Sequence, residues 1–177
     1  MADKQAFRSE QTEEHERGLV HDHENEHDHE QAYDSESGHE HTPHHEHNHR
    51  EQFAVACGEA FLEAHMHDQA ATVSAALCPD EGSVISFEQL VSALSSIASN
   101  AEAAGGIIGH IKAFAREEDV FAHASSTDAS RKPDVEGDTA ASFGPEADIQ
   151  LVAIALLIDQ DELISICKRA IVDALSA

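Results

Sequence analysis

Residues 21–49 constrain this 177-residue chain more than any other stretch, because they cannot form a packed core. They hold ten of the fifteen histidines, separated mainly by Asp and Glu. Residues 1–52 carry fifteen acidic and four basic side chains, and apart from Met1 their only large apolar ones are Phe7, Leu19, Val20 and Tyr33. So little burial cannot offset the conformational entropy lost on ordering. We therefore expect residues 1–50 to be a disordered arm.

Histidines two residues apart recur along this arm. The pairs are His21 and His23, His27 and His29, His39 and His41, His45 and His47, and His47 and His49, with His44 adjacent; His65 and His67 form a sixth pair downstream. In an extended chain such residues point to the same side, so one pair can offer two imidazoles to one ion. Imidazole with carboxylate suits Ni²⁺ and Zn²⁺, and also Co²⁺ and Cu²⁺. The pattern predicts divalent-metal binding.

The arm contains no cysteine, so closed thiolate sites are absent from it. Many overlapping sites of two or three ligands favour low selectivity and fast exchange, which suit a metal buffer, store or donor better than a catalytic centre. The competing interpretation is a solvated low-complexity linker, but such a linker needs no repeated chelating pairs.

In composition the arm resembles the His-rich segments of nickel- and zinc-handling proteins, such as His-rich hydrogenase and urease maturation factors and the loops of zinc transporters. The resemblance covers about a quarter of the chain and implies metal delivery or storage. Residues 68–177 depart from the maturation GTPases, because they have no Gly-x-x-x-x-Gly-Lys-Ser/Thr loop. Nucleotide hydrolysis is therefore not implied.

The remaining sequence predicts a small α+β domain. We expect a short helix over residues 51–64 within a junction at 51–67, from Phe53, Cys57 and Phe61 at spacing four. Residues 68–177 then form the domain proper. Its predicted elements are a strand at 70–77, a helix capped by Ser86 and Gln89, a strand hairpin at 107–115 and 120–124, a long mobile loop at 125–146, a strand at 148–158 buried on both faces, and a helix capped by Asp159. The order β-α-β-β-β-α predicts a two-layer sandwich with both helices on one side of a four-stranded sheet.

The formal net charge of −25 disfavours nucleic acid and anionic membranes as partners. The sequence shows no signal-peptide core and no apolar run of the roughly 20 residues that a membrane helix needs, so we expect a cytoplasmic protein. Cys57, Cys78 and Cys167 are widely spaced, which disfavours disulfides or structural zinc and predicts small buried side chains.

The domain has a candidate site of its own on the predicted hairpin. Alternation places Ile108, His110, Lys112 and Phe114 on one face, with Ile107 and Gly109 on the other. A tight turn at Glu117 and Glu118 would put Lys112 opposite His123 and His110 opposite Ser125. One hypothesis is that His110 and His123, helped by His65 and His67, bind metal or, because of Lys112, an anion. The alternative is a partly solvated sheet face or a self-association surface.

These features predict a metal-binding accessory protein that serves a metal-recipient protein or a metal-transporter component. Two other classes stay open: a small enzyme or ligand-binding domain with a metal-capturing tail, and a metal-sensing regulatory subunit. No Gly-x-Ser-x-Gly or His-Glu-x-x-His motif points to a particular reaction.

Overall fold

The computed structural model describes residues 48–177. Most of the histidines predicted to bind metal lie outside the described residues, namely His21, His23, His27, His29, His39, His41, His44, His45 and His47. Their predicted role is therefore a matter of sequence alone. Of the predicted ligands in the arm, His49 is within the described part.

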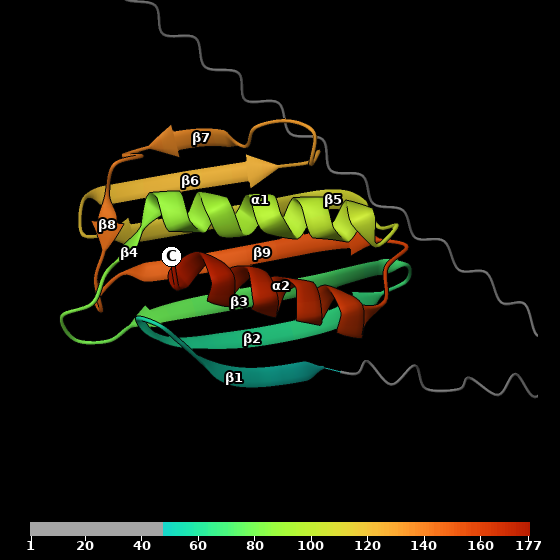
Figure 1. The fold of residues 1–177 in the computed structure, drawn as a ribbon, viewed down its shortest axis with the longest axis horizontal. Coiled ribbons are helices and arrows are strands. Elements are labelled where there is room, and N and C mark those ends of the chain that lie inside the picture. Colours follow the sequence, from blue (N-terminus) through green and yellow to red (C-terminus); the bar gives the residue numbers. More distant parts are fainter. Residues whose placement is uncertain (1–47) are drawn as a thin grey trace, which may run out of the picture. The chain divides into compact units, whose positions relative to one another are not determined.

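The described chain forms one layer of sheet covered on one side by two helices (Figure 1). Seven antiparallel strands make the main sheet in the order β1-β2-β3-β9-β5-β6-β7. The prediction of an α+β fold with both helices on one side is confirmed, but the sheet is larger than the four strands expected.

The strand bounds are β1 His49–Val55, β2 Gly58–His67, β3 Ala70–Pro79, β5 Ile107–Glu117, β6 Val120–Ser126, β7 Asp134–Gly137 and β9 Asp148–Leu156. A separate two-strand pair joins β4 Ile85–Ser86 to β8 Ser142–Phe143. The helices are α1 Phe87–Ala103 and α2 Gln160–Leu175. The predicted strand at 70–77, the hairpin and both helices are therefore confirmed in kind.

Three expectations are wrong. Residues 51–64 form most of the β1–β2 hairpin instead of a helix, and β1 already begins at His49, within the predicted arm. Residues 125–146 are not a structureless loop, because they contain β7 and β8 and bury Phe143 completely. Finally, β9 is central, between β3 and β5, but only one of its faces is covered by helices.

Small side chains bring the helices close to the sheet. On the covered face, alanines such as Ala64, Ala75 and Ala153 are at most 2% exposed. Larger residues of both helices fill the space above them, including Leu90, Leu94, Ile97, Leu163, Ile166 and Ile171. Burying one such side chain stabilises the fold by about 1.5–3 kcal/mol. The helices thus cover only one face of the sheet.

Local signals explain where the helices begin. Ser86 accepts a hydrogen bond from the backbone of Gln89, and the Gln89 side chain accepts one from the backbone of Ser86, which is the expected capping box. Asp159 caps α2 by accepting from the backbone N–H of Asp161. Of the helices in residues 48–177, none combines the length and the apolar content that spanning a membrane requires.

Candidate functional site

The hairpin residues of the predicted domain site share one face of the sheet, but in a different register. His123 lies opposite Phe114 and Lys112 lies opposite Ser125, because the turn consists of Glu118 and Asp119. Glu118 adopts a positive φ of 51° there. The predicted pairs of Lys112 with His123 and of His110 with Ser125 are therefore wrong by two residues.

An irregularity in β5 also reverses the predicted faces of Ile107 and Ile108. The pairing of β5 with β9 shifts between Ile108 and His110, as in a β-bulge. Ile108 is consequently buried under the helices, whereas Ile107 is 55% exposed on the other face. His110, Lys112 and Phe114 keep their common face, which α1 and α2 leave uncovered. We call this side of the sheet the open face.

His110 is partly buried on the open face. Its Nε2 atom is shielded from solvent and has no hydrogen-bond partner within residues 48–177. Burial lowers the pKa of His110 below its ordinary value, and the nearby charges of Lys112 and His123 lower it further. This environment favours the neutral imidazole, the form that binds metal, while Lys112 beside it disfavours a cation.

His65 does not join His110 in one site. Thr72 of β3 and Ile154 of β9 stand between them in the same row across the sheet. Three strand spacings separate the two histidines by about 14 Å. His67 lies at the end of β2, where its Nδ1 is 3.3 Å from a carboxylate oxygen of Asp68. The structure therefore does not bring His65, His67, His110 and His123 together in one site.

A second candidate site lies where the described chain begins. A cavity of about 470 Å³ is lined by Asn48, His49, Met66, Asp159, Gln160 and Asp161. The Nε2 atom of His49 is shielded and lies 3.6 Å from a carboxylate oxygen of Glu51. An imidazole and two carboxylates thus border the cavity at the point where the His-rich segment ends. Sequence reasoning assigned only a capping role to Asp159 and no role to Asp161, so it missed this cavity.

In residues 48–177, no group of three or more His, Cys, Asp or Glu side chains is close enough to hold a metal ion. The cysteines differ among themselves. Cys167 is buried, which raises the pKa of its thiol to about 12, and Cys57 is partly buried. Cys78 is exposed on the open face, so the expectation of burial is wrong for it.

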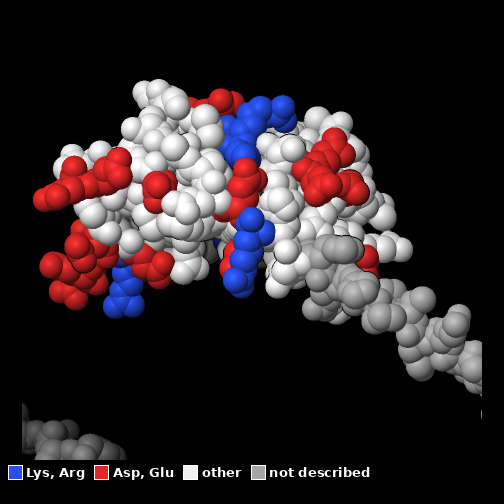
Figure 2. Space-filling model, turned by 90° about the horizontal axis from the view of Figure 1, so that it is seen from below, with Lys and Arg blue, Asp and Glu red and all other residues white. Residues whose placement is uncertain are grey.

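Charge is unevenly distributed over the face of the domain on the β1 side. Viewed from the β1 side, most of the surface is uncharged, and acidic groups gather towards its two ends (Figure 2). Lys and Arg side chains lie between these ends, with further acidic side chains among them. One ion pair on this edge of the sheet joins Arg50 to Glu63 at 2.9 Å. Acidic side chains are therefore not spread evenly over this face of the domain.

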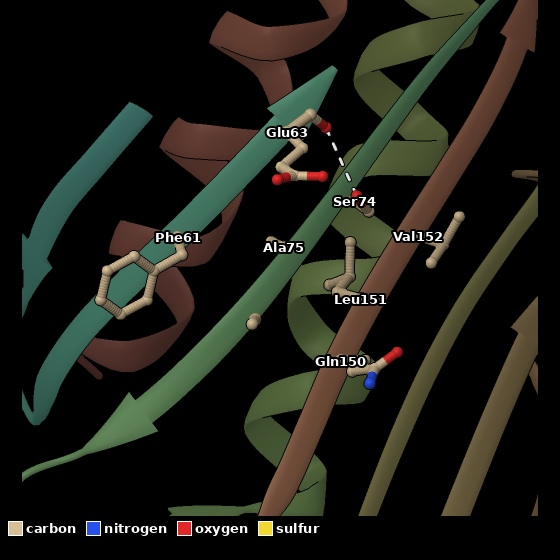
Figure 3. Close-up of a pocket in the computed structure, with 8 residues that line it drawn as sticks. Phe61, Glu63, Ser74, Ala75, Gln150, Leu151 and Val152 are labelled. Atoms are coloured by element: carbon tan, nitrogen blue, oxygen red, sulfur yellow. Dashed lines mark hydrogen bonds between the residues drawn. The ribbon is translucent and has the colours of Figure 1, made fainter. Parts of the chain in front are cut away.

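The open face has a shallow hollow near its centre. Its lining includes two small side chains of β3, Ser74 and Ala76. Phe61 borders it on one side, and Gln150 and Val152 border it on the other (Figure 3). Its volume is about 220 Å³. Phe61 is 42% exposed despite its size. Sequence reasoning missed this hollow, although the alternation of small and large residues in β2 and β3 was its signal.

Comparisons of the chain with protein-family models, with curated proteins and with solved structures found no match.

Proposed function

We propose that this chain is a divalent-metal-binding accessory protein, in which the His-rich segment captures Ni²⁺ or Zn²⁺, or alternatively Co²⁺ or Cu²⁺. The observation that carries the proposal is the repetition of His-x-His pairs among carboxylates between residues 21 and 49. Each pair is a bidentate ligand set for borderline divalent ions. Exchange among many such sets suits buffering or delivery in the cytoplasm.

The domain supports this proposal through the position of His49. This last histidine of the segment opens edge strand β1 and borders the cavity with Asp159 and Asp161. The partner is a metal-recipient protein or a metal-transporter component, recognised by the folded domain.

Calorimetric titration of the full chain with Ni²⁺ and Zn²⁺ tests the proposal. We expect several ions to bind with micromolar affinity at pH 7.5 and more weakly at pH 6, because ligating imidazoles must lose their protons. Replacing the ten histidines from His21 to His49 with Gln should abolish most of this binding.

The matched control replaces His65, His67, His110 and His123 with Gln and keeps the arm. Its stoichiometry should stay close to that of the natural chain. Equal binding by both variants, or no binding at either pH, would refute the assignment of the metal to the arm.

A further inference from the structure

The open face of the sheet is built like one half of an interface. Its two central strands, β3 and β9, present Thr72, Ser74 and Ala76 opposite Ile154, Val152 and Gln150. None of these six side chains is charged, although the described domain is strongly acidic. Depletion of charge at the centre is characteristic of the buried core of protein interfaces.

The apolar content of β9 also exceeds what the helices require. Leu151 and Ala153 are fully buried under them. Val152 and Ile154 point to the open face, where they are only partly covered, and Leu156 is 37% exposed. A strand that is apolar on both sides is the pattern of a sheet covered on both faces. The described domain supplies a cover for only one of them.

The size of the open face fits a second protein domain. Seven strands about 4.8 Å apart, of which all but the four-residue β7 are 7 to 11 residues long, present roughly 800 Å². A stable interface of standard size takes about 800 Å² from each partner. The His-rich segment suits this face poorly, because it is acidic like the domain and has few large apolar side chains.

Charges flank the uncharged centre with opposite signs. On β2, next to β3, stand Glu59 and Glu63; on β5, next to β9, stand Lys112 and Arg116. Glu63 and Lys112 belong to one row, with Ser74 and Val152 between them. In the neighbouring row, Phe61 and Phe114 hold the equivalent positions. The face is therefore complementary to itself about the line between β3 and β9.

We propose that the open face binds a second copy of this chain through a two-fold axis that runs parallel to the strands between β3 and β9. This rotation places Lys112 of each copy over Glu63 of the other, and Phe114 over Phe61. The two sheets then pack face to face with nearly aligned strands, as in other sheet sandwiches. Contacts of this kind are isologous, so the assembly closes as a dimer.

The alternative two-fold axis, perpendicular to the strands, is disfavoured by charge. It would lay β2 over β2, so that Glu59 and Glu63 would meet acidic residues of the same strand in the second copy. Like charges across an interface cost several kcal/mol. Glu63 also pairs with Arg50, but its side chain is still 57% exposed and so can be reached by Lys112 of the second copy.

Sedimentation velocity of the full chain in excess chelator tests the dimer without any contribution from metal bridging. We expect a mass twice that of the 19.1 kDa chain at concentrations of about 10 μM or above. Ala76→Arg, which fills the hollow with a charged side chain, should weaken association at least about 100-fold. Val84→Arg, at an exposed site outside the main sheet, is its matched control and should leave the dimer intact.

Charge exchange tests the axis itself. Glu63→Lys and Lys112→Glu should each weaken association about tenfold, whereas the double variant should recover to within about threefold of the natural chain. Arg169→Glu, on the exposed side of α2, controls for the change in net charge. Circular dichroism shows whether each variant folds. If Ala76→Arg does not fold, the Glu63 and Lys112 variants test the dimer in its place.

A natural chain that is monomeric at about 100 μM would overturn the proposal, whether it binds another protein or not. A dimer that survives Ala76→Arg would also overturn it. Loss of the dimer in both single charge variants without recovery in the double variant would overturn the proposed axis. Because chelator is present throughout, none of these results depends on metal binding by the arm.

Discussion

Lys168 of α2 donates a hydrogen bond to the carboxylate of Glu51 on β1, and so ties the last helix to the first strand. The same Lys168 Nζ lies 5.2 Å from the centre of the Phe53 ring, in cation–π contact. This hydrogen bond is the largest cause of a pKa of Glu51 below its ordinary value. These contacts hold the edge strand that directly follows the His-rich segment against the domain.

Replacing Lys168 with Ala should therefore loosen β1. We expect the free energy of unfolding to fall by about 1 kcal/mol, a modest loss because the Lys168 side chain is 38% exposed. Urea denaturation measures the stability, and hydrogen exchange measures the protection of β1 amides. Protection should fall in β1 more than in the central strand β9.

Arg169→Ala is the control for this change, because it removes a charge from the exposed side of the same helix. It should alter stability by less than about 0.5 kcal/mol. If the two variants had equal effects on β1 protection, the contact with Glu51 and Phe53 would not be what holds the strand.

Sequence patterns predicted the correct helix or strand where a local signal and the tertiary environment agreed. Ser86 and Gln89 form the expected capping box, and Gly105 and Gly106 follow the end of α1. The strand at 70–77 and the hairpin around Glu118 were predictable for the same reason, since turn residues bound apolar strands. The order of these elements indicated the α+β class and predicted both helices on one side of the sheet.

The predicted helix over residues 51–64 failed because two periodicities compete there. Phe53 and Phe61 are eight residues apart, as on one helix face, but the structure puts Phe53 on the helix-covered side and Phe61 on the open face. The alternation of Ala60, Leu62 and Ala64, all buried, was the better signal. The two-residue alternation, which pairs β2 with β3, therefore determines the structure here, and the four-residue spacing does not.

The candidate site was predictable in its residue types but not in its geometry. The common face of His110 and Lys112 follows from alternation alone. The turn at Glu118 and the bulge after Ile108 each displace the pairing, and neither has a strong local signal. The open face itself depends on strand order, which brings Glu63 and Lys112 to opposite sides of β3 and β9. Strand order of this kind results from packing of the whole domain.

Gly58, the first residue of β2, lies close to the backbone at the end of β3, so its replacement should be strongly destabilising. Its φ is 153°, and an added Cβ would lie 2.1 Å from the backbone oxygen of Cys78. Gly58→Ala should therefore lower the free energy of unfolding by at least about 3 kcal/mol, through backbone strain and separation of β2 from β3. Thermal and urea unfolding of the variant measure this loss.

Gly82→Ala provides the matched control. Gly82 also has a positive φ, 84°, but no heavy atom lies within 4 Å of the position that a Cβ would take there. We expect a cost of about 1–2 kcal/mol from the conformation alone. Equal losses at Gly58 and Gly82 would mean that the close approach to Cys78 relaxes without cost.

His110 should make the stability of the domain depend on pH below neutrality. Because burial, Lys112 and His123 lower the pKa of His110 from 6.5, the unfolded chain takes up a proton at a higher pH than the folded one. The stabilising contribution is thus complete above pH 6.5 and is lost as the pH falls through the lower pKa of the folded state. Urea denaturation between pH 7.5 and pH 5 should show this loss in the natural chain and a flatter dependence in His110→Gln.

NMR titration isolates the cause of this dependence, because it follows the His110 imidazole itself. The midpoint of His110 should lie below 6.5 and move upward in Lys112→Gln, since that variant removes a nearby positive charge. Arg169→Gln removes a charge on α2 instead and should leave the midpoint unchanged. A midpoint at or above 6.5 in the natural chain would show that the imidazole is solvated and that this part of the open face is more accessible than its geometry indicates.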